Sequence, residues 1–200
     1  MSADQGSESW LLERVGFCTA SNASAVLAKG QGKTRTAYLR RLVCERLTGK
    51  PTETYSNSHT ERGLAQEPFA RLAYEGATGN FITEVGFIPH KSLMAGASSD
   101  GLIDLDGEVE IKSTIPTVHL DTVLSGGYPP EHRAQIMFQL WILGRSWCDF
   151  VSFCPDMPDN LKLYIFRVVR DEPFIATLAA EVKQFLSEVD ALVAKMKEIK

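Results

Sequence analysis

Three charged residues in the middle of the chain, Asp100, Glu110 and Lys112, are of the types that bind metal ions and activate water. Two carboxylates a few ångströms apart repel each other unless a proton or a cation lies between them, and hard oxygen ligands favour Mg²⁺ or Mn²⁺. A lysine beside them can orient or deprotonate an attacking water molecule. The three residues could therefore form a metal-dependent hydrolytic centre, or they could be alternating charges on a solvent-facing pair of strands.

Whether these residues meet depends on the register of the hairpin that they are predicted to form. A two-residue turn at 106–107 would place Asp100 and Glu110 on opposite faces. A three-residue loop at 105–107, with its glycine in the left-handed conformation, would pair Asp100 with Lys112. Side chains alternate along a strand, so the odd-numbered residues then form an apolar face and the even-numbered residues a polar one. We predict this second register, which gathers both carboxylates and the lysine.

The spacing from Asp100 to Glu110-Ile111-Lys112 resembles the signature of the PD-(D/E)xK nucleases, with Ser99 at the position of the proline. Three more segments resemble motifs of one branch of that superfamily, the lambda exonuclease and YqaJ-type viral recombinase (alkaline exonuclease) branch. In chain order they are Trp10, Arg14 and Gly16 with Thr19-Ala20-Ser21; Arg62-Gly63 with Glu67-Pro68; and Gln135 with Gln139. Four motifs in the same order are far more specific than a Glu-x-Lys triplet alone.

The resemblance implies a magnesium centre in which Mn²⁺ could substitute. Asp100 and Glu110 would bind the metal together with the backbone carbonyl of Ile111. Lys112 would position or activate the attacking water. Glu67 would approach the metal from a helix, directly or through water; the alternative for Glu67 is an ordinary surface glutamate.

The resemblance also implies a pocket for a terminal 5′-phosphate, formed by Arg14, Ser21 and Ser98. An arginine fork, hydroxyl donors and the N-terminus of a helix beginning at Ser21 would all favour an anion. Such a pocket would anchor the end of a strand and convert an endonuclease fold into an exonuclease that releases mononucleotides.

Further residues are expected to support catalysis or to contact DNA. Gln135 shares a predicted helical face with His132. We expect Gln135 to support the active centre and His132, which stands where the family has a tyrosine, to contact DNA. Lys29, Lys33 and Arg35 lie on or beside a glycine loop, where they could grip the DNA backbone or only add solubilising charge.

The activity implied by the resemblance is a Mg²⁺-dependent 5′→3′ exonuclease acting on double-stranded DNA ends. It would leave a 3′ single-stranded overhang for phage-type homologous recombination. Relatives form a ring of three subunits and act with a single-strand DNA annealing protein, so a homotrimer and such a partner are expected. A PD-(D/E)xK endonuclease of restriction or repair type and a non-catalytic DNA-end-binding accessory protein remain as alternatives.

The net charge of −4 is unusual for a DNA-binding protein, because lysine and arginine supply most of the non-specific affinity for phosphates. Residues 1–50, however, contain eight basic and only four acidic side chains. Within this region Arg40, Arg41 and Arg46 are interpreted as the solvated face of a helix. A ring of subunits could line its channel with basic residues while its outside stays acidic.

The composition predicts one cytoplasmic domain spanning residues 1–200. A hydrophobic content of 44% is enough for a single core, and no run approaches the ~20 apolar residues of a membrane span. The N-terminus does not resemble a secretion signal, so we expect a cytoplasmic protein. The family resemblance implies that the cell is a bacterial host and that a phage or prophage encodes the protein. The four cysteines lack zinc or iron–sulfur spacing and are predicted to be buried free thiols.

The pattern of apolar residues predicts an α/β (α+β) fold, a restriction-endonuclease-like core with a central mixed β-sheet flanked by helices. Pro68 lies inside the helix expected at 59–74 and predicts a bend beside Glu67. Helices are expected at 21–28, 34–48, 59–74, 131–143 and 171–197. Strands are expected at 83–89, 93–100, on both sides of the loop at 105–107, and as a hairpin at 149–154 and 162–169.

Overall fold

A mixed four-stranded sheet lies at the centre of the computed structural model, which describes residues 5–28, 32–52 and 58–199, without the side chains of 58–61. Its strands, in spatial order, are β4 (Gly101–Ile103), β5 (Gly107–Ser113), β6 (Trp147–Phe153) and β7 (Leu163–Val169). β5 and β6 are parallel, while β4 and β7 pair antiparallel at the two edges. The predicted central mixed sheet is therefore confirmed.

A second, three-stranded sheet brings the N-terminal segment next to the residues that precede Asp100. Its order is β1 (Cys18–Thr19), β3 (Ala95–Ala97) and β2 (Ile88–Pro89), and β1 runs parallel to β3. Because Thr19 pairs with Gly96, the segment around Ser21 and the segment around Ser98 leave the sheet side by side. These two segments were predicted to share the phosphate pocket.

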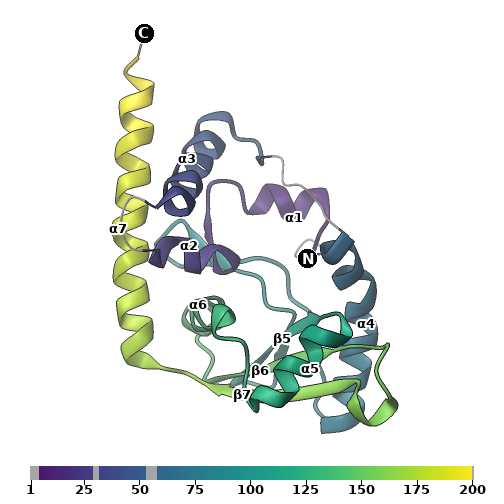
Figure 1. Cartoon of the computed structure of the whole chain (residues 1–200). Coiled ribbons are helices and arrows are strands. Elements are labelled where there is room, and N and C mark those ends of the chain that lie inside the picture. The colour runs from purple at the N-terminus through teal and green to yellow at the C-terminus, as the bar shows by residue number, and fades with distance from the viewer. Residues whose placement is uncertain (1–4, 29–31, 53–57, 200) are drawn as a thin grey trace.

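Helices cover both faces of the four-stranded sheet (Figure 1). α4 (Ser58–Thr78) packs on one face through a small apolar cluster that includes Tyr74, Val109 and Ile111. The other face lies against α6 (Arg133–Leu143), in a larger core shared with α7 (Glu172–Lys197) and with α2 (Ala23–Leu27) and α3 (Lys33–Thr48). Odd-numbered side chains of β5 therefore face α4, and even-numbered ones face α6.

Shorter elements complete the chain. They are α1 (Glu8–Glu13), α5 (Pro116–Ser125) and the 3₁₀ turns η1 (Ala20–Asn22), η2 (Pro130–His132) and η3 (Asp159–Leu161). The sequence analysis missed α5, which has proline at its start and a left-handed Gly126 at its end. Threonine and valine within its ten residues weaken the helical signal, and buried His119 fixes it instead by contacts with β6 and η3.

Several predicted elements are confirmed with small shifts at their ends, namely α3, α6, α7 and the hairpin of β6 and β7. The helix predicted at 21–28 is present as α2, but its predicted start is wrong, because Ser21 lies in the 3₁₀ turn η1 and α2 begins at Ala23. The strands predicted at 83–89 and 93–100 are reduced to β2 and β3, and Thr83 forms only an isolated bridge with Leu102. Cys44 is exposed, whereas the other three cysteines are buried free thiols as predicted.

The hairpin formed by β4 and β5 has a different register from the predicted one. Its loop is 104–106 and not 105–107, because Ile103 pairs with Gly107. Asp104, with a φ of 45°, takes the left-handed conformation that was expected at Gly107, and aspartate tolerates this conformation better than most residues. The shift is an even number of residues, so every side chain keeps its predicted face.

Contacts with the start of β6 explain the shift in register. A Cβ atom at Gly107 would lie 2.2 Å from the ring of Trp147, so β5 can pass this indole only with glycine there. Arg145, just before β6, donates a hydrogen bond to the carbonyl of Asp104 at 2.9 Å. Both contacts join residues far apart in sequence, and a local pattern cannot reveal them.

No helix in the described part of the chain is both long and apolar enough to cross a membrane.

Candidate active site

Two buried carboxylates, Asp100 and Glu110, lie at the junction of β4 and β5, with exposed fractions of 9% and 2%. Asp100 precedes β4 and is not paired with Lys112, so that predicted pairing is wrong. The N–H of Ile111 instead donates a hydrogen bond to Oδ2 of Asp100 at 2.7 Å. In a strand, the N–H and C=O of one residue point to the same side, so the Ile111 carbonyl also points toward Asp100.

Electrostatic interactions couple these groups tightly. Burial raises the pKa of Asp100 well above its usual range, and the nearby Glu110 and Glu67 raise it further. Burial by itself would lower the pKa of Lys112, but Glu110 and Asp100 outweigh it and raise this pKa above its usual value. Lys112 is therefore a charged hydrogen-bond donor beside the carboxylates, which favours its role in orienting water over a role as base.

Glu110 is held by three donors. Nζ of Lys112 lies 2.5 Å from its Oε1, and Nε2 of Gln135 donates to the same oxygen at 2.6 Å. Nε2 of Gln139 donates to Oε2 at 2.6 Å and also to the backbone carbonyl of Ser98 at 3.2 Å. The two glutamines are four residues apart on α6, as the helical spacing predicted, and they fix the orientation of the carboxylate.

Glu67 and His132 lie at the edges of this group. Glu67, on α4, lines the same cavity, and its Oε1 forms an ion pair with Arg71, so this oxygen is already engaged by a cation of the chain. The ring of His132 stacks on Phe150 with a centroid separation of 5.4 Å. Burial, together with the positive charge of Lys112, lowers the pKa of His132 and favours the neutral ring.

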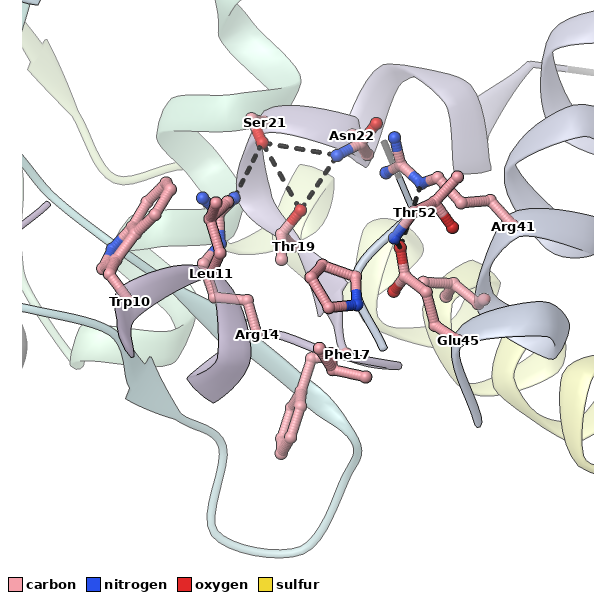
Figure 2. A pocket seen from close by; sticks show the side chains of 13 residues that line it. Trp10, Leu11, Arg14, Phe17, Thr19, Ser21, Asn22, Arg41, Glu45 and Thr52 are labelled. Atoms are coloured by element: carbon pink, nitrogen blue, oxygen red, sulfur yellow. Dashed lines mark hydrogen bonds and ion pairs between the residues drawn. The ribbon is translucent and has the colours of Figure 1, made fainter. Parts of the chain in front are cut away.

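The predicted phosphate pocket lines the same cavity as the carboxylates. Figure 2 shows two of its residues, Arg14 and Ser21, beside each other. The guanidinium of Arg14 lies 3.7 Å from the ring centroid of Trp10, and it donates to Oγ of Ser21 at 3.5 Å. Trp10 donates from Nε1 to Oγ of Ser98 at 3.0 Å. Burial lowers the pKa of Arg14 to about 10, so this group remains a cation at neutral pH. The structure thus brings Arg14, Ser21 and Ser98 together, as predicted.

One cavity of about 330 Å³ connects the two predicted sites. The predicted residues that line it are Arg14, Ser21, Glu67, Ser98, Asp100, Glu110, Ile111, Lys112 and Gln135. Its lining residues come from α1, β1, η1, α4, β5 and α6 and from the segments between them. The same cavity can therefore hold the end of a strand and the bond to be cleaved.

Two of the basic residues predicted to grip DNA, Lys33 and Arg35, do not line this cavity. Arg35 forms a bidentate ion pair with Glu188 of α7, at 2.7 and 2.9 Å, so its charge is already balanced within the chain. Lys33 is exposed at the first turn of α3. Lys29 lies outside the described residues. The structure therefore gives Arg35 a structural partner, and the DNA contact of Lys33 stays a prediction.

Some residues of the site were missed as functional residues. Gln139 was recognised as part of a motif, but its contact with Glu110 makes it as close to the centre as Gln135. Trp10, which positions both Arg14 and Ser98, could have been found from its place four residues before Arg14 on a helix.

The donors of the cavity fit a small, hard divalent cation. Two carboxylates and one carbonyl oxygen, from Asp100, Glu110 and Ile111, are the ligands that Mg²⁺ uses when water and substrate complete its shell. Burial and the neighbouring carboxylates raise the pKa of Asp100, because a buried pair of negative charges is unfavourable. A bound cation would remove this repulsion. Within the described ranges, no three His, Cys, Asp or Glu side chains form a group that could hold a metal by themselves. The carbonyl of Ile111 remains the expected third ligand from the protein.

Residues 9–146, more than half of the chain, match the model of the YqaJ-like viral recombinase domain family. The chain belongs to this family. The matched range contains every residue that the sequence analysis assigned to the metal centre, the phosphate pocket and the DNA contacts. The resemblance inferred from four short motifs is therefore confirmed.

Two solved structures are similar to this chain along nearly its whole length. Two crystal structures of the alkaline exonuclease LHK-Exo from Laribacter hongkongensis, one in complex with dAMP, are 37% and 38% identical to it. The alignments cover 96% of both chains, with TM-scores of 0.89 and 0.90. The restriction-endonuclease-like α/β fold is thus confirmed.

A phage-related exonuclease from Haemophilus somnus 129PT is 11% identical, with a TM-score of 0.70 over 90% of this chain and 96% of its own. At this identity the likeness shows a shared fold. A comparison with curated protein sequences gave no match.

Proposed function

We propose that the chain is a Mg²⁺-dependent exonuclease that degrades one strand of linear double-stranded DNA in the 5′→3′ direction. It would release mononucleotides and leave a 3′ single-stranded overhang for phage-type homologous recombination. Membership of the YqaJ-like viral recombinase family and the likeness to an alkaline exonuclease support the broader assignment as a DNA exonuclease. The dAMP bound to that relative is a deoxynucleoside monophosphate, the type of product proposed here.

One observation carries the proposal: the carboxylates and an arginine without an acidic partner share a single cavity. Asp100, Glu110 and Lys112 would suffice for an endonuclease. Arg14 lies beside them, and among the described residues no carboxylate forms an ion pair with it. A partly buried cation with which no described carboxylate pairs favours an anion in the pocket, and the terminal phosphate of a DNA strand supplies one. This favours cleavage that depends on a strand end.

Asp100, Glu110 and the carbonyl of Ile111 would hold the Mg²⁺. When bound, the ion would make a water molecule more acidic and offset negative charge on the scissile phosphate. The protonated Lys112 would orient the attacking water by donating a hydrogen bond from Nζ. Gln135 would keep Glu110 in place throughout the reaction.

The phosphate pocket would set the polarity and the size of the product. Arg14 and the hydroxyls of Ser21 and Ser98 would hold the terminal 5′-phosphate at one end of the cavity. The next phosphodiester along the strand would then lie at Asp100 and Glu110, so each cleavage would release one nucleotide. Holding the reacting groups in this way replaces a chance encounter with a fixed geometry.

A comparison of linear and closed circular duplex DNA tests this proposal. In Mg²⁺, the wild-type protein is expected to degrade linear duplex and to leave a covalently closed circle intact. Asp100→Asn is expected to lose the degradation of linear duplex, because it removes a ligand and keeps the shape of the side chain. Cleavage of the circle would contradict the exonuclease assignment and favour an endonuclease; binding of ends without cleavage by the wild type would favour an accessory protein.

We also propose a homotrimeric ring that encircles DNA and acts with a single-strand DNA annealing protein in the bacterial cytoplasm. The overall charge of −4 supports an arrangement in which a channel collects the basic residues. Sedimentation equilibrium is expected to give three times the mass of the chain. A monomer that degrades long duplexes without dissociating would contradict the ring.

A further inference from the structure

A second cavity continues from Arg14 away from the carboxylates, and it contains Arg41, which the proposed reaction does not use. This cavity has a volume of about 270 Å³ and shares Trp10, Arg14, Thr19 and Ser21 with the first one. Figure 2 shows the hydroxyls of Thr19 and Ser21 and the amide of Asn22 between Arg14 on one side and Arg41 on the other. The end of a strand held at Arg14 would thus face a second guanidinium group.

Arg41 is poorly neutralised for an arginine that is more than half buried. Its Nε atom is buried and has no hydrogen-bond partner among the described residues. Its ion pair with Glu45 is long, with 3.8 Å between Nε and Oε1, and its guanidinium lies 4.7 Å from the ring centroid of Tyr38. Glu45 accepts hydrogen bonds from the N–H of Gly16 at 2.9 Å and from that of Thr52 at 3.4 Å, so part of its charge is used elsewhere. The expected solvated face of α3 is therefore wrong for Arg41.

Two guanidinium groups in one partly buried cavity repel each other. The repulsion is visible at Arg14, whose pKa is lowered mainly by burial and also by the charge of Arg41. Among the described residues that line this pocket, two arginines face one glutamate, Glu45, which leaves one positive charge in excess. Like charges held together in this way are favourable only when an anion lies between them.

The charge of the ligand distinguishes the end of a strand from its interior. A terminal phosphate monoester carries close to two negative charges at neutral pH, whereas a phosphodiester within the strand carries one. One arginine can bind either group, but its single charge balances only the phosphodiester. We propose that Arg41 is the second cation of this pocket and that it makes the protein select a dianionic terminal phosphate over a monoanionic phosphodiester. This inference rests on the proposed function, since it deepens the role of the pocket at Arg14.

Three duplexes that differ only at the 5′ terminus test the inference. They end in a phosphate, in a methyl phosphate with a single charge, or in a hydroxyl group. The wild type is expected to favour phosphate over methyl phosphate by about tenfold in kcat/KM, mostly through KM, as for one charge-assisted hydrogen bond. Arg41→Gln is expected to lose the preference for phosphate over methyl phosphate, while it still favours methyl phosphate over hydroxyl. Arg41→Lys should keep part of the preference for phosphate, because the positive charge remains.

Arg40→Gln is the matched control, since Arg40 is the exposed neighbour on α3, and it should behave as the wild type. The inference is wrong if Arg41→Gln keeps the wild-type ratio of phosphate to methyl phosphate. It is also wrong if Arg41→Gln lowers the rates on all three duplexes equally, because Arg41 then acts only on the fold. Arg14→Gln separates the two proposals: if it keeps the full preference for phosphorylated ends, the pocket itself is misassigned.

Discussion

Replacing Gln139 by methionine should weaken metal binding and turnover with little change in shape. Gln139 is fully buried, so no water can replace its hydrogen bonds to Glu110 at 2.6 Å and to the Ser98 carbonyl at 3.2 Å. A hydrogen bond to a charged group contributes about 1.5–3 kcal/mol, which corresponds to roughly 10- to 150-fold in an equilibrium or rate constant. We expect a loss of this size in the apparent affinity for Mg²⁺, in kcat/KM, or divided between them.

The assay combines calorimetric titration of Mg²⁺ with single-turnover degradation of a 5′-phosphorylated duplex. Gln184→Met, on the exposed side of α7, is the matched control and should change neither value. Urea unfolding would show whether Gln139→Met is folded under the conditions of the assay. Wild-type Mg²⁺ affinity and rate in a folded Gln139→Met protein would refute the view that α6 fixes the orientation of Glu110.

Three further predictions follow from the geometry. Lys112→Ala should lower turnover by about 10²–10⁴-fold with a much smaller effect on Mg²⁺ affinity, measured by single-turnover kinetics and calorimetry; an equal loss in both would contradict its role in orienting water. In EDTA, Asp100→Asn should be more stable to urea than the wild type at pH 8, by roughly 1–3 kcal/mol. Burial raises the folded-state pKa of Asp100, so its carboxyl favours folding at low pH and loses this contribution as pH rises. The difference in free energy of unfolding between Asp100→Asn and the wild type should therefore vanish near pH 4. A difference that stays constant with pH would contradict the raised pKa. Gly107→Ala should cost about 1–3 kcal/mol through its contact with Trp147, whereas Gly127→Ala, which meets no atom within 4 Å, should be nearly neutral in the same unfolding experiment.

The site could be predicted from the sequence because side chains alternate along strands and repeat along helices. Asp100, Glu110 and Lys112 were placed on the correct face although the predicted register was wrong, since an error of two residues leaves each side chain on its face. The spacing of Gln135 and Gln139 likewise placed both side chains on one face of α6. Such local rules hold wherever an element is regular.

What the sequence could not give depends on contacts between distant segments. The loop of the β4–β5 hairpin is fixed by Trp147 and Arg145, some forty residues away along the chain. Glu108 shares the predicted polar face but is fully buried under α6, and burial together with Glu110 raises its pKa well above the usual range. Arg41 belongs to a basic helix in the sequence, and only the fold places it in a pocket with Arg14.

Strand choice on a single duplex tests the central claim most directly, the claim that one cavity joins a metal centre to a terminal phosphate. The duplex carries a 5′-phosphate on one strand and a 5′-hydroxyl on the other, with a different 3′ label on each. In Mg²⁺, the phosphorylated strand should be shortened from its 5′ end with release of mononucleotides, while its partner remains intact. Degradation of both strands at equal rates, or shortening from the 3′ ends, would contradict the account.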